Sequence, residues 1–79
     1  MTAWKSAGEP DHPVRVAVVA ALEWIGEPCS PVQLAPCLGE MYGTVNYHVR
    51  ALFREGVLSL VSKRPQRGVI EYRYRLAGS

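Results

Sequence analysis

Two short helices joined by a tight connection are predicted over residues 30–58, which read SPVQLAPCLGEMYGTVNYHVRALFREGVL. Ser30 can cap the first helix, Pro31 suits its first position, and Gln33 completes a Ser-x-x-Gln capping box. Gly39 is placed to end this helix in a left-handed conformation. Apolar residues at helical spacing form its core stripe: Leu34, Ala35 and Leu38. We expect the two helices to pack at a steep angle, with a basic hairpin after them.

The second helix of the pair is predicted from about residue 42 to residue 55, with Gly56 as its stop. Val45, Val49 and Leu52 follow one another at helical spacing and turn inward. The opposite face presents an amide, a phenol and two guanidinium groups, from Asn46, Tyr47, Arg50 and Arg54. These side chains can pair with base edges or phosphates in a DNA major groove, although an ordinary solvated helix face has the same polarity.

A β-hairpin is predicted after the helices, from two segments that alternate apolar and polar residues, 57–62 and 69–76. The second segment would turn one face to the core, through Ile70, Tyr72, Tyr74 and Leu76. Pro65 and Gly68 mark the turn between the strands, KRPQRG, whose tip concentrates Lys63, Arg64 and Arg67. A cationic turn can serve solubility alone, but beside a polar helix face it favours contact with a phosphate backbone or a minor groove.

A further helix precedes these elements, capped by Asp11 or His12 and ended by Gly26. Residues at helical spacing form its core stripe: Val14, Val18, Ala21, Leu22 and Ile25. The opposite face is also apolar, through Val16, Val19 and Ala20, with Trp24 to one side. A second copy of the chain in a two-fold dimer would cover this face, or the N-terminal segment with Trp4 would fold back over it.

The 79 residues leave room for a single core, and therefore for one domain over residues 11–79, preceded by an N-terminal arm over residues 1–10. We expect this arm to be disordered or to fold back on the domain. Three helices followed by a two-stranded hairpin predict an α+β, mainly α, fold: the winged helix-turn-helix. In that framework the helix at about 42–55 enters the major groove, and the wing at 63–68 lies along the DNA backbone.

Charge is distributed unevenly along the chain. Two basic side chains face five acidic ones over residues 1–42, whereas seven basic side chains face two acidic ones over residues 43–79. A basic half of this kind is the electrostatic footprint of a small nucleic-acid binder, because each neutralised phosphate releases condensed counterions.

Nothing in the sequence predicts a membrane span or export. The longest strongly apolar run, residues 16–22, is too short to cross a bilayer, and the N-terminal residues lack a secretory pattern. We therefore expect a cytoplasmic protein that does not bind a membrane.

The runs HPVRVAVVAAL, SPVQLAPCLG and GTVNYHVRALFREGVL, followed by a basic hairpin ending in YRYRL, resemble the ArsR-like winged helix-turn-helix family of bacterial transcriptional regulators. The most specific part is the run from Thr44 to Val49, which is similar to the family's Thr-Val-Ser-x-His-Leu recognition segment. The resemblance implies contacts to bases or phosphates from Gly43, Thr44, Asn46, Tyr47 and Arg50. His48 lies at the edge of that face, where it contacts DNA or packs inward. Ser30 and Gln33, at the start of the preceding helix, are added to the predicted DNA contacts.

The chain departs from the family where metal-sensing members have a Cys-x-Cys pair. The matching positions hold Ser30 and Val32, so we expect no metal and no cofactor. Cys29 and Cys37 are too far apart along a helix for a disulfide or one zinc ion, and we expect buried or half-buried thiols. Many members also dimerise through their first helix and a helix after the wing, which has no counterpart before Ser79. The first helix, through Val16, Val19 and Trp24, would then supply the homodimer contact together with the N-terminal segment.

Two functions remain for such a chain. The first is a sequence-specific regulator that binds double-stranded DNA. The second is a protein-interaction module that docks a partner through the apolar outer face of its first helix. An enzyme is not expected, because the pair Glu23 and Glu27 lies on one helix face with no nucleophile, metal ligands or phosphate-binding glycine loop.

Overall fold

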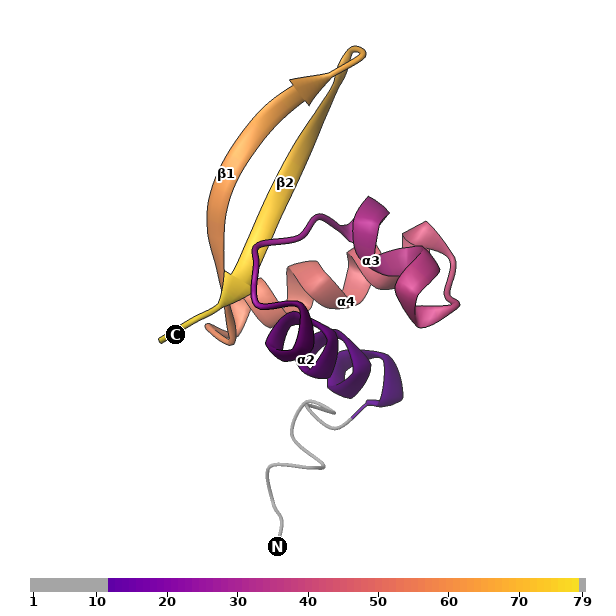
Figure 1. Ribbon diagram of the computed structural model, residues 1–79, viewed down its shortest axis with the longest axis vertical. Helices are drawn as coiled ribbons and strands as arrows, with labels where there is room; N and C mark the ends of the chain where they lie inside the picture. Colours follow the sequence, from indigo (N-terminus) through magenta and orange to yellow (C-terminus); the bar gives the residue numbers. More distant parts are fainter. Residues whose placement is uncertain (1–11, 79) are drawn as a thin grey trace, which may run out of the picture.

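The computed structural model describes residues 12–78, which form three helices followed by a two-stranded antiparallel hairpin (Figure 1). The elements are α2 (Pro13–Ile25), α3 (Pro31–Leu38), α4 (Tyr42–Arg54), β1 (Leu58–Gln66) and β2 (Val69–Leu76). The predicted α+β, mainly helical, winged-helix architecture is confirmed. The expected N-terminal arm, with Trp4, and the expected cap Asp11 lie outside the described residues. No helix within residues 12–78 has the length and hydropathy needed to cross a membrane.

Helix α2 begins and ends where its sequence predicts. The Nδ1 of His12 accepts a hydrogen bond from the backbone N–H of Val14 at 3.1 Å, and Gly26 ends the helix in the left-handed region, with φ 75°. Val14, Val18 and Leu22 are buried, as expected of a core stripe. Ile25, predicted to belong to that stripe, is instead exposed at the last position of the helix.

Helix α3 has the predicted capping box in full. The hydroxyl of Ser30 accepts from the backbone N–H of Gln33 at 3.2 Å, and the Oε1 of Gln33 accepts from the backbone N–H of Ser30 at 2.9 Å. The helix continues through Pro36 and ends at Gly39, whose φ is 65°.

The core lies between the three helices and the base of the hairpin. Leu34 of α3 and Val45 and Val49 of α4 are fully buried within it. From the hairpin only the proximal ends contribute, through Leu58 of β1 and Tyr74 of β2. Ile70 and Tyr72 were expected on the same core face, and that expectation is wrong: they are 52% and 40% exposed. The hairpin is longer than the core, so its distal half projects beyond the helices (Figure 1).

A single bridge ties the α2–α3 connection to the hairpin. Cys29 and Tyr74 exchange two backbone hydrogen bonds, each 2.9 Å long, so the residue before the N-cap of α3 adds to the edge of β2. The Cys29 side chain is buried by this pairing, and burial raises the pKa of its thiol. Cys37, expected to be at least half-buried, is exposed.

The hairpin turn is shorter than its sequence indicates. Arg67 and Gly68 both have positive φ, 52° and 83°, and they form a two-residue connection between Gln66 and Val69. Lys63 and Arg64 were predicted at the tip, but the structure places them within β1. This happens because β1 continues through Pro65, which lies opposite Ile70 on a strand with no further neighbour beyond it.

Candidate nucleic-acid interface

The outer side of α4 exposes most of the polar residues predicted from its sequence. Tyr47 is 62% exposed, and Arg50 and Arg54 are exposed beside it. Asn46 is half-buried at the edge of this face. Gly43 and Thr44 are exposed in the first turn of α4. These residues can therefore be reached from one side of the helix, Asn46 least of all because it is half-buried.

A groove of about 310 Å³ separates this face of α4 from the hairpin. Helix α4 lines it with Tyr42, Asn46, Arg50, Phe53 and Arg54. The hairpin lines it with Leu60, Ile70, Tyr72 and Tyr74. The groove therefore combines cationic and amide groups from the helix with aromatic and aliphatic side chains, most of them from the hairpin.

Tyr74 forms the floor of the groove. Its ring meets that of Phe53 edge to face, with centroids 5.7 Å apart. Burial raises the pKa of the Tyr74 hydroxyl, an effect that the nearby charge of Arg50 opposes. The floor is thus buried and neutral, and the charge of the groove comes from its helix side.

The basic residues of the hairpin do not share one face. Directly paired residues of an antiparallel hairpin lie on the same face, and Lys63 pairs with Tyr72, which lines the groove. Arg64 pairs with Glu71 and lies on the other face, while Arg67 occupies the turn. A bulge between Leu60 and Ser62 changes the register, and without it Lys63 would lie on the face away from the groove.

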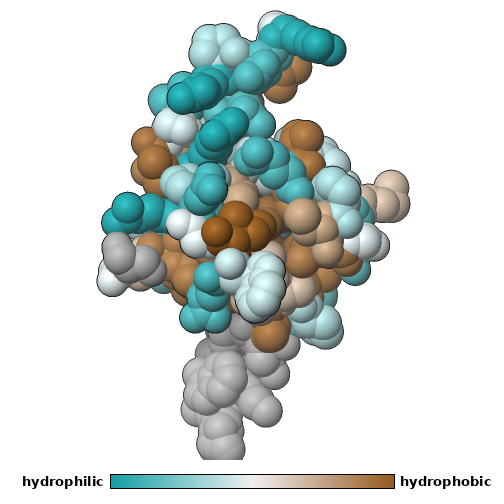
Figure 2. Space-filling view, in the orientation of Figure 1, coloured by the Kyte–Doolittle hydropathy of each residue, from teal (hydrophilic) through white to brown (hydrophobic). Residues whose placement is uncertain are grey.

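Acidic side chains near the basic residues are already engaged. Glu55 forms an ion pair with Arg15, with 2.9 Å between Oε2 and Nη1. Glu71 forms one with Arg73, with 3.6 Å between Oε1 and Nη2. Among residues 12–78 no ion pair involves the basic side chains of the outer α4 face or of the distal hairpin: Arg50, Arg54, Lys63, Arg64 and Arg67. Figure 2 shows hydrophilic residues covering the end of the molecule where the hairpin projects, with hydrophobic residues gathered over the helices.

Two of the predicted DNA-contact residues are buried. The hydroxyl of Ser30 has no exposed surface and donates to Oε2 of Glu71 at 2.9 Å, so it joins α3 to β2. His48 is 8% exposed and accepts a hydrogen bond at Nδ1 from Nε of Arg15 at 3.2 Å. Neither side chain is accessible from the surface. Gln33 is exposed, but its Oε1 is engaged in the capping box.

His48 belongs to a polar cluster between α2 and α4. Its ring lies 4.2 Å from that of His12 and meets Tyr47 edge to face at 5.0 Å. Burial lowers the pKa of His48, and the neighbouring His12 and Arg15 lower it further. The neutral ring is the form that accepts the Arg15 hydrogen bond.

The groove includes residues that the sequence did not single out as a site. Ile70 and Tyr72 read as core positions because they alternate with polar neighbours. Tyr42 lies next to an uncapped helix start, and no side chain of Met41 caps α4. Alternation along a strand shows which residues share a face, but it does not show where the core beneath that face ends.

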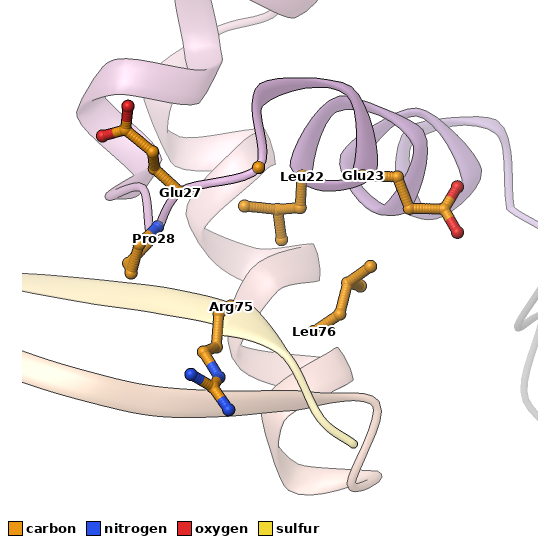
Figure 3. A pocket seen from close by; sticks show the side chains of 7 residues that line it. Leu22, Glu23, Glu27, Pro28, Arg75 and Leu76 are labelled. Atoms are coloured by element: carbon orange, nitrogen blue, oxygen red, sulfur yellow. The ribbon is translucent and has the colours of Figure 1, made fainter. Parts of the chain in front are cut away.

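A second hollow, of about 470 Å³, lies where the end of α2 faces the end of β2. Figure 3 shows Leu22 and Leu76 facing each other across it. The carboxylates of Glu23 and Glu27 and the guanidinium of Arg75 point in different directions, away from this apolar centre (Figure 3). The hollow therefore lacks converging polar groups that would orient a small ligand or a reaction.

No group of three or more His, Cys, Asp or Glu side chains within the described residues could hold a metal ion. A scan of the whole chain against protein-family models found no matching family, and a search of the curated proteins found no match.

Proposed function

We propose that the protein is a sequence-specific double-stranded DNA-binding protein, a transcriptional regulator of the ArsR-like winged helix-turn-helix type. One observation carries this proposal: Asn46 and Arg50 of α4 line a groove beside a projecting hairpin, on which Lys63 is paired with the groove-lining Tyr72. Helix α4 would read the major groove, and the hairpin would contact the backbone or the adjacent minor groove.

The charge arrangement supports a polyanionic partner. Five basic side chains of α4 and the distal hairpin form no ion pair within the described residues, so their contact with phosphates would not first require breaking one: Arg50, Arg54, Lys63, Arg64 and Arg67. Each phosphate contact releases counterions, so affinity for any duplex should fall steeply with salt.

The chemistry of α4 supports base recognition. An asparagine amide can pair in bidentate fashion with adenine, and an arginine can pair with guanine in the major groove. Asn46 and Arg50 are one helical turn apart, and Arg50 is exposed while Asn46 is half-buried at the groove. Two such positions on one helix face can address neighbouring base pairs.

Selection of bound duplexes from a random pool, at two salt concentrations, tests the proposal. We expect one enriched sequence at the higher salt, since base contacts depend less on salt than phosphate contacts. An inverted repeat with half-sites one helical turn apart would indicate two bound copies. No enrichment at either salt concentration would overturn sequence-specific binding.

A second candidate is a protein-interaction module that docks a partner through α2. The exposure of apolar residues on this helix favours it, above all Trp24, which is 89% exposed, and Val16, which is 52% exposed. This candidate predicts no duplex binding at low salt, together with loss of partner binding in a Trp24→Ala variant.

A further inference from the structure

The groove between α4 and the hairpin is more aromatic than contact with an intact duplex requires. Tyr42 is 51% exposed, Tyr72 is 40% exposed, and Phe53 is 41% exposed at the inner end of the groove. A tyrosine hydroxyl can contact a phosphate of duplex DNA, but several rings that face one groove are typical of a site that stacks on unpaired bases.

These rings come from opposite walls of the groove. Tyr42 and Phe53 belong to α4, and Tyr72 belongs to β2, while the buried Tyr74 closes the floor between them. The volume of about 310 Å³ is that of a small-molecule site rather than of a flat contact surface. A planar group entering this space would meet an aromatic side chain on either wall.

The groove also offers polar groups that can bind the base edge and the phosphates of a nucleotide. Asn46 lines the groove from α4 and offers an amide that can pair with a base edge. Arg50 lines the groove too, and Lys63 lies on the same hairpin face as Tyr72. These two cations can hold the phosphates that flank a base inserted between them.

We propose that this groove binds an unpaired nucleobase, so that the protein prefers duplex DNA with one unpaired nucleotide over the same duplex fully paired. Tyr72 and Tyr42 stack on the base, Asn46 pairs with its edge, and Arg50 and Lys63 bind the flanking phosphates. The inference rests on the proposed function, because α4 must lie against DNA for a base to enter the groove.

Binding of the full chain to three fluorescent DNA probes tests the inference. The probes are a duplex, the same duplex with a single-nucleotide bulge, and the bulged strand alone. We expect the bulged duplex to bind about tenfold or more tightly than the paired duplex, the gain that one stacked base supplies. Tightest binding of the single strand would overturn the preference for a duplex context.

Two tyrosine variants make the test specific. Tyr72→Ala should remove the preference for the bulge, so that the variant binds the bulged and the paired duplex with equal affinity. Tyr47→Ala is the matched control, because Tyr47 is exposed on α4 but does not line the groove. It should weaken binding to both duplexes by the same factor. Tyr72→Phe keeps the ring and should keep the preference, which separates stacking from any change in folding.

The outcomes separate this inference from the proposed function. Equal affinity for paired and bulged duplexes overturns the nucleobase site and leaves duplex binding intact. Absence of binding to every probe at low salt overturns both. A bulge preference that survives in Tyr72→Ala also overturns the site, because the preference would then arise outside the groove.

Discussion

Arg15 of α2 donates a hydrogen bond from its Nε to Nδ1 of His48 in α4, over 3.2 Å. The same guanidinium pairs through Nη1 with Oε2 of Glu55, just past the end of α4, at 2.9 Å. One side chain of α2 therefore holds α4 at two points about two turns apart. Because Arg15 and His48 are both buried, this clamp fixes which face of α4 remains outside.

Arg15→Met should lower the free energy of unfolding by about 1–3 kcal/mol, because it leaves a buried His48 acceptor and the Glu55 carboxylate without their partner. Urea denaturation followed by circular dichroism measures this. Arg54→Met is the matched control, since Arg54 is exposed on the same pair of helices and has no ion pair among the described residues. It should change stability by less than about 0.5 kcal/mol. Equal losses in the two variants would contradict the clamp.

The pKa of His48 is lowered from 6.5, so the folded state favours the neutral ring and the unfolded chain binds more protons. This contribution to stability is complete above pH 6.5 and is lost as the pH falls toward the lowered pKa of the folded state. His12 and Arg15 disfavour the protonated ring, whereas Glu40 acts in the opposite direction.

We therefore expect stability to fall as the pH drops below 6.5, and the fall to be smaller in His48→Gln, whose amide oxygen can accept from Arg15 without titrating. Urea denaturation at several pH values gives the comparison. Carboxylates that titrate in both proteins cancel in the difference between them. Parallel pH profiles for the two proteins would show that His48 does not carry this dependence.

The ends of the helices and most of their core positions were predictable from the sequence, because capping residues and apolar spacing are features of a short local segment. The Ser30 capping box and the left-handed residues Gly26 and Gly39 are where the sequence predicts them. The direction of His48 was not predictable, since its partner Arg15 is 33 residues away and on another helix. The hairpin turn was also missed, because a non-glycine residue, Arg67, takes the positive φ.

The groove was not predictable from the sequence, because it depends on how two distant segments are placed against each other. Its shape depends on the register of the hairpin, and a bulge beside Leu60 sets that register. The bulge determines that Lys63 shares a face with Tyr72, whereas simple alternation through β1 would separate them. No residue type at this position signals the extra residue.

Ser30→Ala should destabilise the protein by about 1–3 kcal/mol, because the hydroxyl both caps α3 and donates to a carboxylate oxygen of Glu71. Thermal unfolding followed by circular dichroism measures the loss. Gln33→Ala removes only the reciprocal half of the capping box and should cost less. A larger loss in Gln33→Ala than in Ser30→Ala would show that the contact with the hairpin contributes little.

Substitutions on α4 and on the hairpin should affect DNA binding differently. Lys63→Ala, Arg64→Ala and Arg67→Ala should each weaken binding to every duplex alike and reduce the salt slope by about 1. Asn46→Ala and Arg50→Ala should instead lower the discrimination at single base pairs, by about 1–3 kcal/mol each. Fluorescence anisotropy with the selected duplex and its single-base variants separates the two effects. Uniform losses from all five changes would contradict the division of roles.

The exposed side of α2 should hold two copies of the chain together. Val16, Ala20 and Trp24 follow one another at four-residue spacing, and all three are exposed. If two α2 helices pack antiparallel about a two-fold axis at Ala20, Val16 of each copy meets Trp24 of the other. The small side chain of Ala20 then allows the helix backbones to approach closely.

Sedimentation at micromolar concentration should therefore show a species of twice 8.7 kDa, in exchange with the monomer because one helix pair buries little area. Ala20→Glu should give only monomer, since it places two carboxylates against each other at the axis. Val69→Glu is the matched control, because Val69 is also an exposed apolar residue and lies at the far end of the hairpin. It should leave the dimer unchanged. A single 8.7 kDa species of the unmodified chain would exclude the dimer and leave the α2 face to another protein.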